Sequence, residues 1–283
     1  MAWQAAELID LDRYPIHRDG PDLAALLAQV RADLARDGCA VLKGFVRARA
    51  VAHLVDEAES VANRGHRSFS RTNPYFTRDD PGLPCSDPRR RFYDRSNAFV
   101  AADNLRPSGP IRTIHDAPGF DSFIRDCLLQ PPARFFRYAD PLADVIVNMA
   151  EAGNGFPWHF DTNNFTVTLA IQNAEGGGAF EYAANIRSSS DENFDAVARV
   201  LDGTSDQVTV LNLEPGDLQI FRGRYSLHRV APLTGRRRRH VAIFSYVQQP
   251  GMVGSPERTR QLYGRVLPVH LERAGQRADP LID

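Results

Sequence analysis

The chain has 283 residues, of which 43% are hydrophobic and 24% charged, and its formal net charge at pH 7 is -1. This length and hydrophobic content suffice for a large core, and we expect a single catalytic domain over residues 1–283. The near-neutral charge excludes a protein built around nucleic acid or an anionic membrane surface, since either partner favours a strong basic excess.

Three features bear on the compartment. No stretch of the chain approaches the ~20 apolar residues that cross a bilayer, and the acidic first 14 residues lack the apolar segment of a secretion signal. The three cysteines, Cys39, Cys85 and Cys127, are odd in number and widely spaced, which is typical of reduced thiols rather than a disulfide framework. We therefore expect a cytoplasmic protein with no membrane partner.

The N-terminal part predicts helices around one short strand. Apolar residues recur at helical spacing over residues 21–37, with Asp22 in the first turn and Gly38 just after the end, so a helix is predicted there. Residues 39–46 form the apolar run of a short strand, and residues 48–62 predict a second amphipathic helix.

A long irregular segment follows. Residues 64–110 are rich in Pro, Asp, Arg and Ser, and a loop of this length inside a compact domain is usually functional. Residues 120–130 predict another helix, and residues 131–140 a connector. Residues 1–144 are thus predicted to be a helical support and active-site cover region.

After residue 144 the pattern changes to short strands divided by turn residues, with an insertion over 188–203. A mainly β fold with a helical N-terminal part is expected, in which residues 145–250 form a double-sheet jelly roll with flanking helices and residues 251–283 a C-terminal extension. The predicted strands are 145–150, 158–162, 165–172, 179–183, 208–213, 218–222, 226–231 and 240–247.

Three side chains in this region have the chemistry of a metal site. His159 and Asp161 are two residues apart in a predicted strand, so strand alternation puts both on one face. His228 follows in a later strand. Two imidazoles and one carboxylate on one side of a metal leave the opposite positions open, the arrangement of non-haem iron(II) oxygenases. His159, Asp161 and His228 are therefore the candidate metal ligands and catalytic residues.

Several segments, in order along the chain, resemble the iron(II)/2-oxoglutarate-dependent oxygenases: WHFDTNNFTVTLAIQ, GGGAFEY, PGDLQIF, SLHRVAP and RHVAIFSY. NGFPWHFDTNNFTVTL, with PRRR upstream, is similar to bacterial free-amino-acid halogenases and their hydroxylating relatives. The resemblance implies a double-stranded β-helix (a cupin-like jelly roll), Fe(II), 2-oxoglutarate and O2. It also implies a dioxygenase that hydroxylates or otherwise oxidatively tailors a small polar substrate, a free amino acid or derivative, releasing succinate and CO2.

The same resemblance bears on the outcome of the reaction. In the halogenases a small residue replaces the carboxylate of the HxD motif, and chloride fills the coordination position that this opens. Asp161 is present here, so oxygenation rather than chlorination is expected.

A cation is needed for the distal carboxylate of 2-oxoglutarate, and the planar fork of arginine suits a carboxylate best. Arg239 opens the predicted strand after His228, where the family places this arginine, and Arg237 shares its face as the second candidate. Thr168 and Asn148, on neighbouring strands, are predicted to contact the cosubstrate.

The carboxylate of an amino-acid substrate would need its own cation. Arg90 and Arg95, in the segment predicted to fold over the site, are the candidates for this role. Ser245 and Tyr263 are predicted to line the same pocket.

Two other classes remain open at this point. A zinc-dependent hydrolase could use the same three ligands with a metal-bound water, but it would need a nearby general base and no arginine for 2-oxoglutarate. A non-catalytic jelly-roll binding protein would keep the two histidines as core residues.

Overall fold

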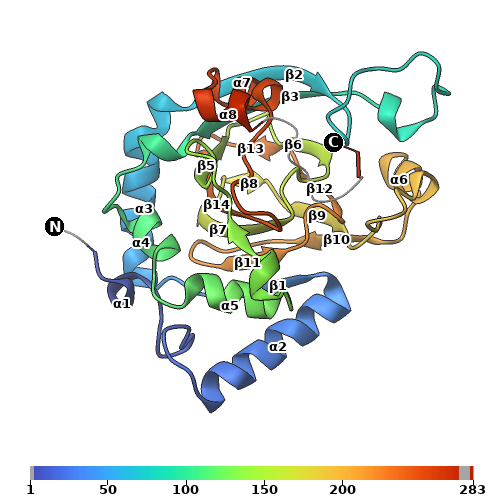
Figure 1. Cartoon of the computed structure of the whole chain (residues 1–283). Helices are drawn as coiled ribbons and strands as arrows, with labels where there is room; N and C mark the ends of the chain where they lie inside the picture. The colour runs from blue at the N-terminus through green and yellow to red at the C-terminus, as the bar shows by residue number, and fades with distance from the viewer. Residues whose placement is uncertain (1–2, 274–280, 283) are drawn as a thin grey trace.

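The computed structural model describes residues 3–273 and 281–282. Two antiparallel sheets form the centre of the described part, and most of the N-terminal helices lie outside the larger one (Figure 1). The larger sheet has eight strands in the order β1-β11-β7-β14-β5-β3-β2, with β4 paired to β14, and the smaller has four in the order β10-β9-β12-β6. The double-stranded β-helix that the resemblance implied is confirmed.

The strands of the larger sheet are β1 (Cys39–Leu42), β2 (His66–Thr72), β3 (Tyr93–Val100), β4 (Phe136–Arg137), β5 (Val145–Ala150), β7 (Phe165–Gln172), β11 (Leu218–Phe221) and β14 (Arg239–Val247). The smaller sheet contains β6 (Phe156–His159), β9 (Phe180–Ala183), β10 (Val208–Leu211) and β12 (Leu227–Val230). A separate two-stranded pair joins β8 (Gly176–Gly177) and β13 (Leu233–Thr234).

The α-helices are α1 (Ala5–Leu8), α2 (Pro21–Asp37), α3 (Ala48–Val61), α4 (Pro110–His115), α5 (Phe120–Cys127), α6 (Phe194–Leu201), α7 (Pro256–Tyr263) and α8 (Pro268–Glu272). Short 3-10 turns lie at Ala62–Arg64, Pro88–Arg90, Ala102–Asn104 and Pro132–Arg134. None of these helices is both long and apolar enough to cross a bilayer. Cys39, Cys85 and Cys127 are free thiols.

The predicted helix over 21–37 is confirmed at both ends: Pro21 occupies the first turn, and Gly38 ends the helix in the left-handed conformation. The prediction of an uninterrupted loop over 64–110 is wrong, because β2 and β3 pair with each other and β3 pairs with β5. Asp94, Arg95 and Asn97 interrupt the apolar pattern of β3, and these charged and polar residues concealed the strand. The insertion over 188–203 contains α6.

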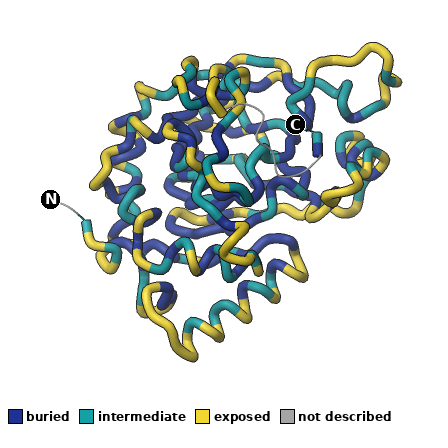
Figure 2. Tube along the Cα trace, in the orientation of Figure 1, coloured by how far each residue is buried: buried dark blue, intermediate teal, exposed yellow. Residues whose placement is uncertain are grey.

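Alternation along β14 separates the main core from the interior of the β-helix. Ala242, Phe244 and Tyr246 belong to the large apolar cluster that includes the helices, whereas Arg239, Val241, Ile243 and Ser245 line a cavity on the other face. Figure 2 shows buried residues along the central strands and exposed residues on the outer helices and long loops. The strand therefore presents one face to the core and one to a site.

Candidate active site

The cavity between the two sheets has a volume of about 620 Å³ and contains His159, Asp161 and His228 in its wall. His159 ends β6 and His228 lies in β12, and these antiparallel strands place the two histidines directly opposite each other. Asp161 lies beyond the end of β6, where its backbone N–H donates to the carbonyl of Gly223 at 3.1 Å. The predicted strand 158–162 is thus too long, and this loop contact, not strand alternation, places the carboxylate.

The three side chains converge on one point. Asp161 Oδ1 lies 3.8 Å from His159 Nε2 and 3.5 Å from His228 Nε2, and one ligand atom from each residue lies within 4.8 Å of the others. His159 Nδ1 bonds the carbonyl of Pro157 at 2.8 Å, and His228 Nδ1 bonds that of Ser226 at 2.9 Å. Because a carbonyl only accepts, both Nδ1 atoms carry the proton, which leaves each Nε2 lone pair facing the shared point.

Local electrostatics keep the ligands in their metal-binding forms. Burial and the neighbouring ring of His228 lower the pKa of His159 well below its usual range, so this imidazole is neutral. Burial alone would raise the pKa of Asp161, but its interactions with the two histidines outweigh burial and lower the pKa to about 2. A neutral imidazole beside an ionised carboxylate is the form that a divalent metal binds.

A short hydrogen-bonded chain holds the outer oxygen of the carboxylate. Thr166 Oγ1 donates to Asp161 Oδ2 at 2.5 Å, and Asn163 Nδ2 donates to Thr166 Oγ1 at 3.0 Å. Asn163 thereby directs the threonine proton toward Asp161. A Cβ at Gly223 would lie 1.8 Å from Asp161 Oδ2, so glycine is required there. These contacts leave Oδ1 as the oxygen available to a metal.

We predict that Thr166→Val weakens metal binding by about 10–100-fold, the usual cost of losing a partner that orients a ligand. Thr166→Ser should retain most of the affinity, because it keeps the hydroxyl. Anaerobic titration with Fe(II) or Co(II) measures the effect. Thr168→Val is the matched control, since Thr168 lies on the same face of β7. Equal metal affinity in Thr166→Val and the wild-type protein would contradict the role given to Thr166.

Arg239 is the buried cation of the cavity. It is 6% exposed, lines the cavity wall, and has no hydrogen-bond or ion-pair partner for its guanidinium among the described residues. Burial lowers its pKa to about 10, so it stays protonated at pH 7. Thr168 and Asn148 line the same cavity, and Asn148 Nδ2 is buried without a hydrogen-bond partner. This part of the wall can accept a carboxylate.

Arg237 does not reach the cavity. β14 begins only at Arg239, so strand alternation does not extend back to position 237. The Arg237 guanidinium instead donates to the carbonyls of Asn173 and Ala174 on the surface. The prediction that Arg237 shares the face of Arg239 and could bind 2-oxoglutarate is therefore wrong.

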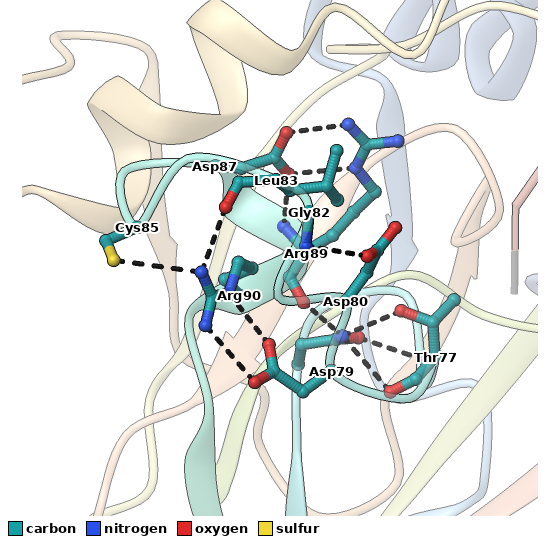
Figure 3. Close-up of polar contacts among 10 residues, drawn as sticks. Thr77, Asp79, Asp80, Gly82, Leu83, Cys85, Asp87, Arg89 and Arg90 are labelled. Carbon is teal, nitrogen blue, oxygen red and sulfur yellow. Dashed lines mark hydrogen bonds and ion pairs between the residues drawn. The ribbon is translucent and has the colours of Figure 1, made fainter.

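Arg90 is also outside the cavity wall. Its guanidinium bonds the Asp79 carboxylate, the Leu83 carbonyl and the Cys85 sulfur within its own loop (Figure 3). Neighbouring Arg89 pairs with Asp87 in the same view. These arginines brace the loop between β2 and β3, and the prediction that Arg90 contacts substrate is not supported by its position.

Arg95 lies in strand β3 rather than in a loop, and it is not itself part of the cavity wall but packs against aromatic rings that are. It is 2% exposed, and none of its three guanidinium nitrogens has a hydrogen-bond partner among the described residues. Its Cζ lies 4.4 Å from the ring centre of Phe156 and 5.2 Å from that of Phe99, and both rings line the cavity. Burial and the charge of Arg258 lower the pKa of Arg95 well below its usual range.

Ser245 and Tyr263 line the cavity as predicted. Apart from Tyr263, sequence reasoning missed the contribution of the C-terminal extension, of which residues 252–255 and most of α7 form part of the wall. It also missed Thr166 as the partner of Asp161. The phenylalanines around the two histidines carried no signal, because an isolated apolar residue in the sequence is as typical of a core as of a pocket.

Comparisons with known proteins agree with this site. A family model described as Halogenase D matches residues 99–259, more than half of the chain. No curated protein sequence matches. Among solved structures, the non-haem α-ketoglutarate-dependent epimerase SnoN from nogalamycin biosynthesis is 17% identical, with 91% of each chain covered and a TM-score of 0.55.

Two further structures share the fold. AviO1 from Streptomyces viridochromogenes Tue57 is 16% identical over 81% of this chain and 97% of its own, with a TM-score of 0.54. HygX from Streptomyces hygroscopicus is 11% identical over 78% of this chain and 87% of its own, with a TM-score of 0.51. With the His-Asp-His site and the matched family model, the chain belongs to the Halogenase D family and is an Fe(II)/2-oxoglutarate-dependent oxygenase.

Proposed function

We propose that the protein hydroxylates, or otherwise oxidatively tailors, a small polar molecule of the amino-acid class, with release of succinate and CO2. One observation carries this proposal: a single cavity contains both a candidate metal site and a buried cation. The metal site is formed by His159, Asp161 and His228, and the cation is Arg239, which has no partner among the described residues. A metal that keeps open positions and a cation for a distal carboxylate are the two requirements of 2-oxoglutarate chemistry.

His159, Asp161 and His228 would hold Fe(II) through two Nε2 atoms and Oδ1. When bound, iron with 2-oxoglutarate and O2 supplies the oxidising chemistry. Arg239 would pair with the distal carboxylate of 2-oxoglutarate, while Thr168 and Asn148 contact the cosubstrate from the neighbouring strands. The protein thus binds and orients the reactants and limits the access of water to them.

The ligands bound in two structures of related fold support the same cofactors. One SnoN structure contains Fe3+, α-ketoglutarate and nogalamycin RO, and the HygX structure contains nickel, 2-oxoglutarate and hygromycin B. The zinc-hydrolase and binding-protein alternatives explain neither the family match nor a cation such as Arg239 in the metal cavity.

Arg95 would bind the carboxylate of the substrate, and Ser245 and Tyr263 would line its pocket. A buried guanidinium without hydrogen bonds is costly, and an anionic ligand group would offset that cost. The loop between β2 and β3 supplies Phe76, Thr77 and Phe92 to the cavity wall, which supports its role as a cover over the site.

The test is an anaerobic titration of the purified protein with Fe(II) and 2-oxoglutarate. We expect the weak visible charge-transfer band that arises when 2-oxoglutarate chelates iron. A screen of free amino acids and their derivatives should then show substrate-dependent succinate release, with the product identified by mass spectrometry. A protein that binds Fe(II) but forms no such band with 2-oxoglutarate would exclude the proposed function.

A further inference from the structure

Four phenylalanines surround the two candidate histidine ligands, and we refer to them as the phenylalanine collar. Phe156 and Phe76 have ring centres 3.9 and 5.8 Å from that of His159. Phe221 and Phe180 lie 5.0 and 5.5 Å from His228. All four residues line the cavity. Apolar rings therefore pack against both histidines in the cavity wall. They surround the metal position only in part, because the Asp161–Thr166–Asn163 chain also lies in the wall, and Thr166 and Asn163 are polar but uncharged.

Acidic side chains are few in this wall. In the described part of the chain, Asp140, Asp161 and Glu257 are the carboxylates that line the cavity. Asp161 is the candidate ligand, and the side chain of Glu257 is 79% exposed and lies 3.5 Å from an arginine, Arg78.

Both carboxylate oxygens of Asp140 already have hydrogen-bond partners within the protein. Its Oδ1 accepts from the backbone N–H of Leu142, and its Oδ2 accepts from that of Gly254 and lies 3.0 Å from His270 Nε2. Among the described residues of the cavity wall, no carboxylate is left to pair with a cationic side chain beside the collar. A charged group buried there without a partner would be strongly disfavoured.

Anionic side chains are disfavoured for a different reason. Two buried positive groups already have proposed partners: Arg239 would pair with the cosubstrate, and Arg95 with the substrate carboxylate. The other arginines of the cavity wall have partners within the protein: Arg71 lies 3.7 Å from Asp94, Arg78 lies 3.5 Å from Glu257, and Arg258 bonds Gln261 and lies over the ring of Phe76. A second acidic group on the substrate would enter among the rings of Phe156, Phe180 and Phe221 without a cation of its own. We therefore expect neither a cationic nor an anionic group at the end of the substrate that lies next to the metal position.

We propose that the substrate is anchored by a carboxylate and presents an uncharged, apolar side chain to the metal, so that amino acids with cationic or acidic side chains are rejected. This inference rests on the proposed function and narrows its substrate class. The phenylalanine collar is the specificity-determining element, and Arg95 is the anchor.

The experiment compares L-norleucine with L-lysine, which differ by the terminal ammonium group, and adds L-phenylalanine and L-glutamate. Succinate release and the shift of the anaerobic charge-transfer band are measured for each compound with the iron- and 2-oxoglutarate-loaded protein. We expect kcat/KM for norleucine or phenylalanine to exceed that for lysine and glutamate by at least ~100-fold, because an unpaired buried charge is costly.

Variants test the carboxylate anchor and the phenylalanine collar separately. Arg95→Met should raise KM for the preferred amino acid by more than ~10-fold and leave the charge-transfer band unchanged. Arg91→Met is the matched control, since Arg91 forms a partly exposed ion pair with Asp202, and it should have no effect. Phe180→Glu should shift preference toward lysine, whereas Phe180→Leu should not.

The outcomes separate the two proposals. A missing charge-transfer band overturns the proposed function itself. A normal band with lysine or glutamate preferred over norleucine and phenylalanine overturns the collar proposal alone. A normal band that no amino acid shifts overturns the amino-acid substrate class, and with it the collar proposal, but leaves the reaction with 2-oxoglutarate standing. An unchanged KM in Arg95→Met removes Arg95 as the anchor.

Discussion

Asp161→Gly is expected to abolish oxygenation, with a loss larger than the ~10–100-fold that follows removal of an outer partner of a metal ligand. Asp161 Oδ1 is the only carboxylate oxygen that faces both histidine Nε2 atoms in the described structure. Without it, two imidazoles remain, and Thr166 loses its acceptor. Metal titration and mass spectrometry of the products measure the result.

The same variant tests the choice between oxygen and chloride. In the wild-type protein the carboxylate would occupy the position that chloride takes in the halogenases, so we expect no chlorinated product from the wild-type enzyme in chloride buffer. Asp161→Gly would open that position. A clean change to chlorination is still not expected, because halogenation also requires that the substrate be held where it reacts with chloride and not with the competing hydroxyl ligand of the metal.

Two results would contradict this reading. A chlorinated product from the wild-type enzyme would mean that Asp161 does not exclude chloride. Full hydroxylation by Asp161→Gly would mean that Asp161 is not a metal ligand. Membership of the Halogenase D family makes both measurements decisive, because the family name does not by itself specify the reaction of this chain.

Arg239→Ala is expected to weaken the binding of 2-oxoglutarate by about 2–4 kcal/mol, or roughly 30- to 1000-fold in affinity. The reason is the loss of a charge-assisted pair in a buried site. Iron affinity in the absence of 2-oxoglutarate should be unchanged, since Arg239 makes no contact with the three candidate ligands in the described structure. Titration of the charge-transfer band with 2-oxoglutarate measures the difference.

Arg237→Ala is the matched control for this experiment. Its guanidinium bonds surface carbonyls, so its loss should leave 2-oxoglutarate affinity within about twofold of the wild-type value. An unchanged affinity in Arg239→Ala, or a loss in Arg237→Ala as large as that expected for Arg239→Ala, would reject the assignment of the cosubstrate arginine.

The amino-acid sequence alone was sufficient for the β-helix core and the histidine pair. β5 and β7 have the bounds that their apolar runs predict, because a buried strand between turn residues has a strong local pattern. His159, Asp161 and His228 were identifiable because the ligand types and their order along the chain are local properties too. Arg239 was placed by its position at the start of a strand.

Other features depended on the tertiary structure. β2 and β3 are held by pairing with each other and with β5, and this long-range pairing overrides a local composition that resembles a loop. The same pairing buries Arg95 against the ring of Phe156, whereas Arg90, five residues earlier, bonds its own loop. Nothing in the sequence around these two arginines distinguishes them.

The surroundings of the candidate ligands also come from the tertiary structure. Asp161 is positioned by Gly223, 62 residues away along the chain, and the phenylalanine collar gathers residues from one loop and three strands. Sequence patterns report which face of an element is apolar, but they do not report which faces meet. The sequence by itself therefore determined the chemistry of the site, and only the folded chain decided what surrounds it, because that depends on contacts between distant segments.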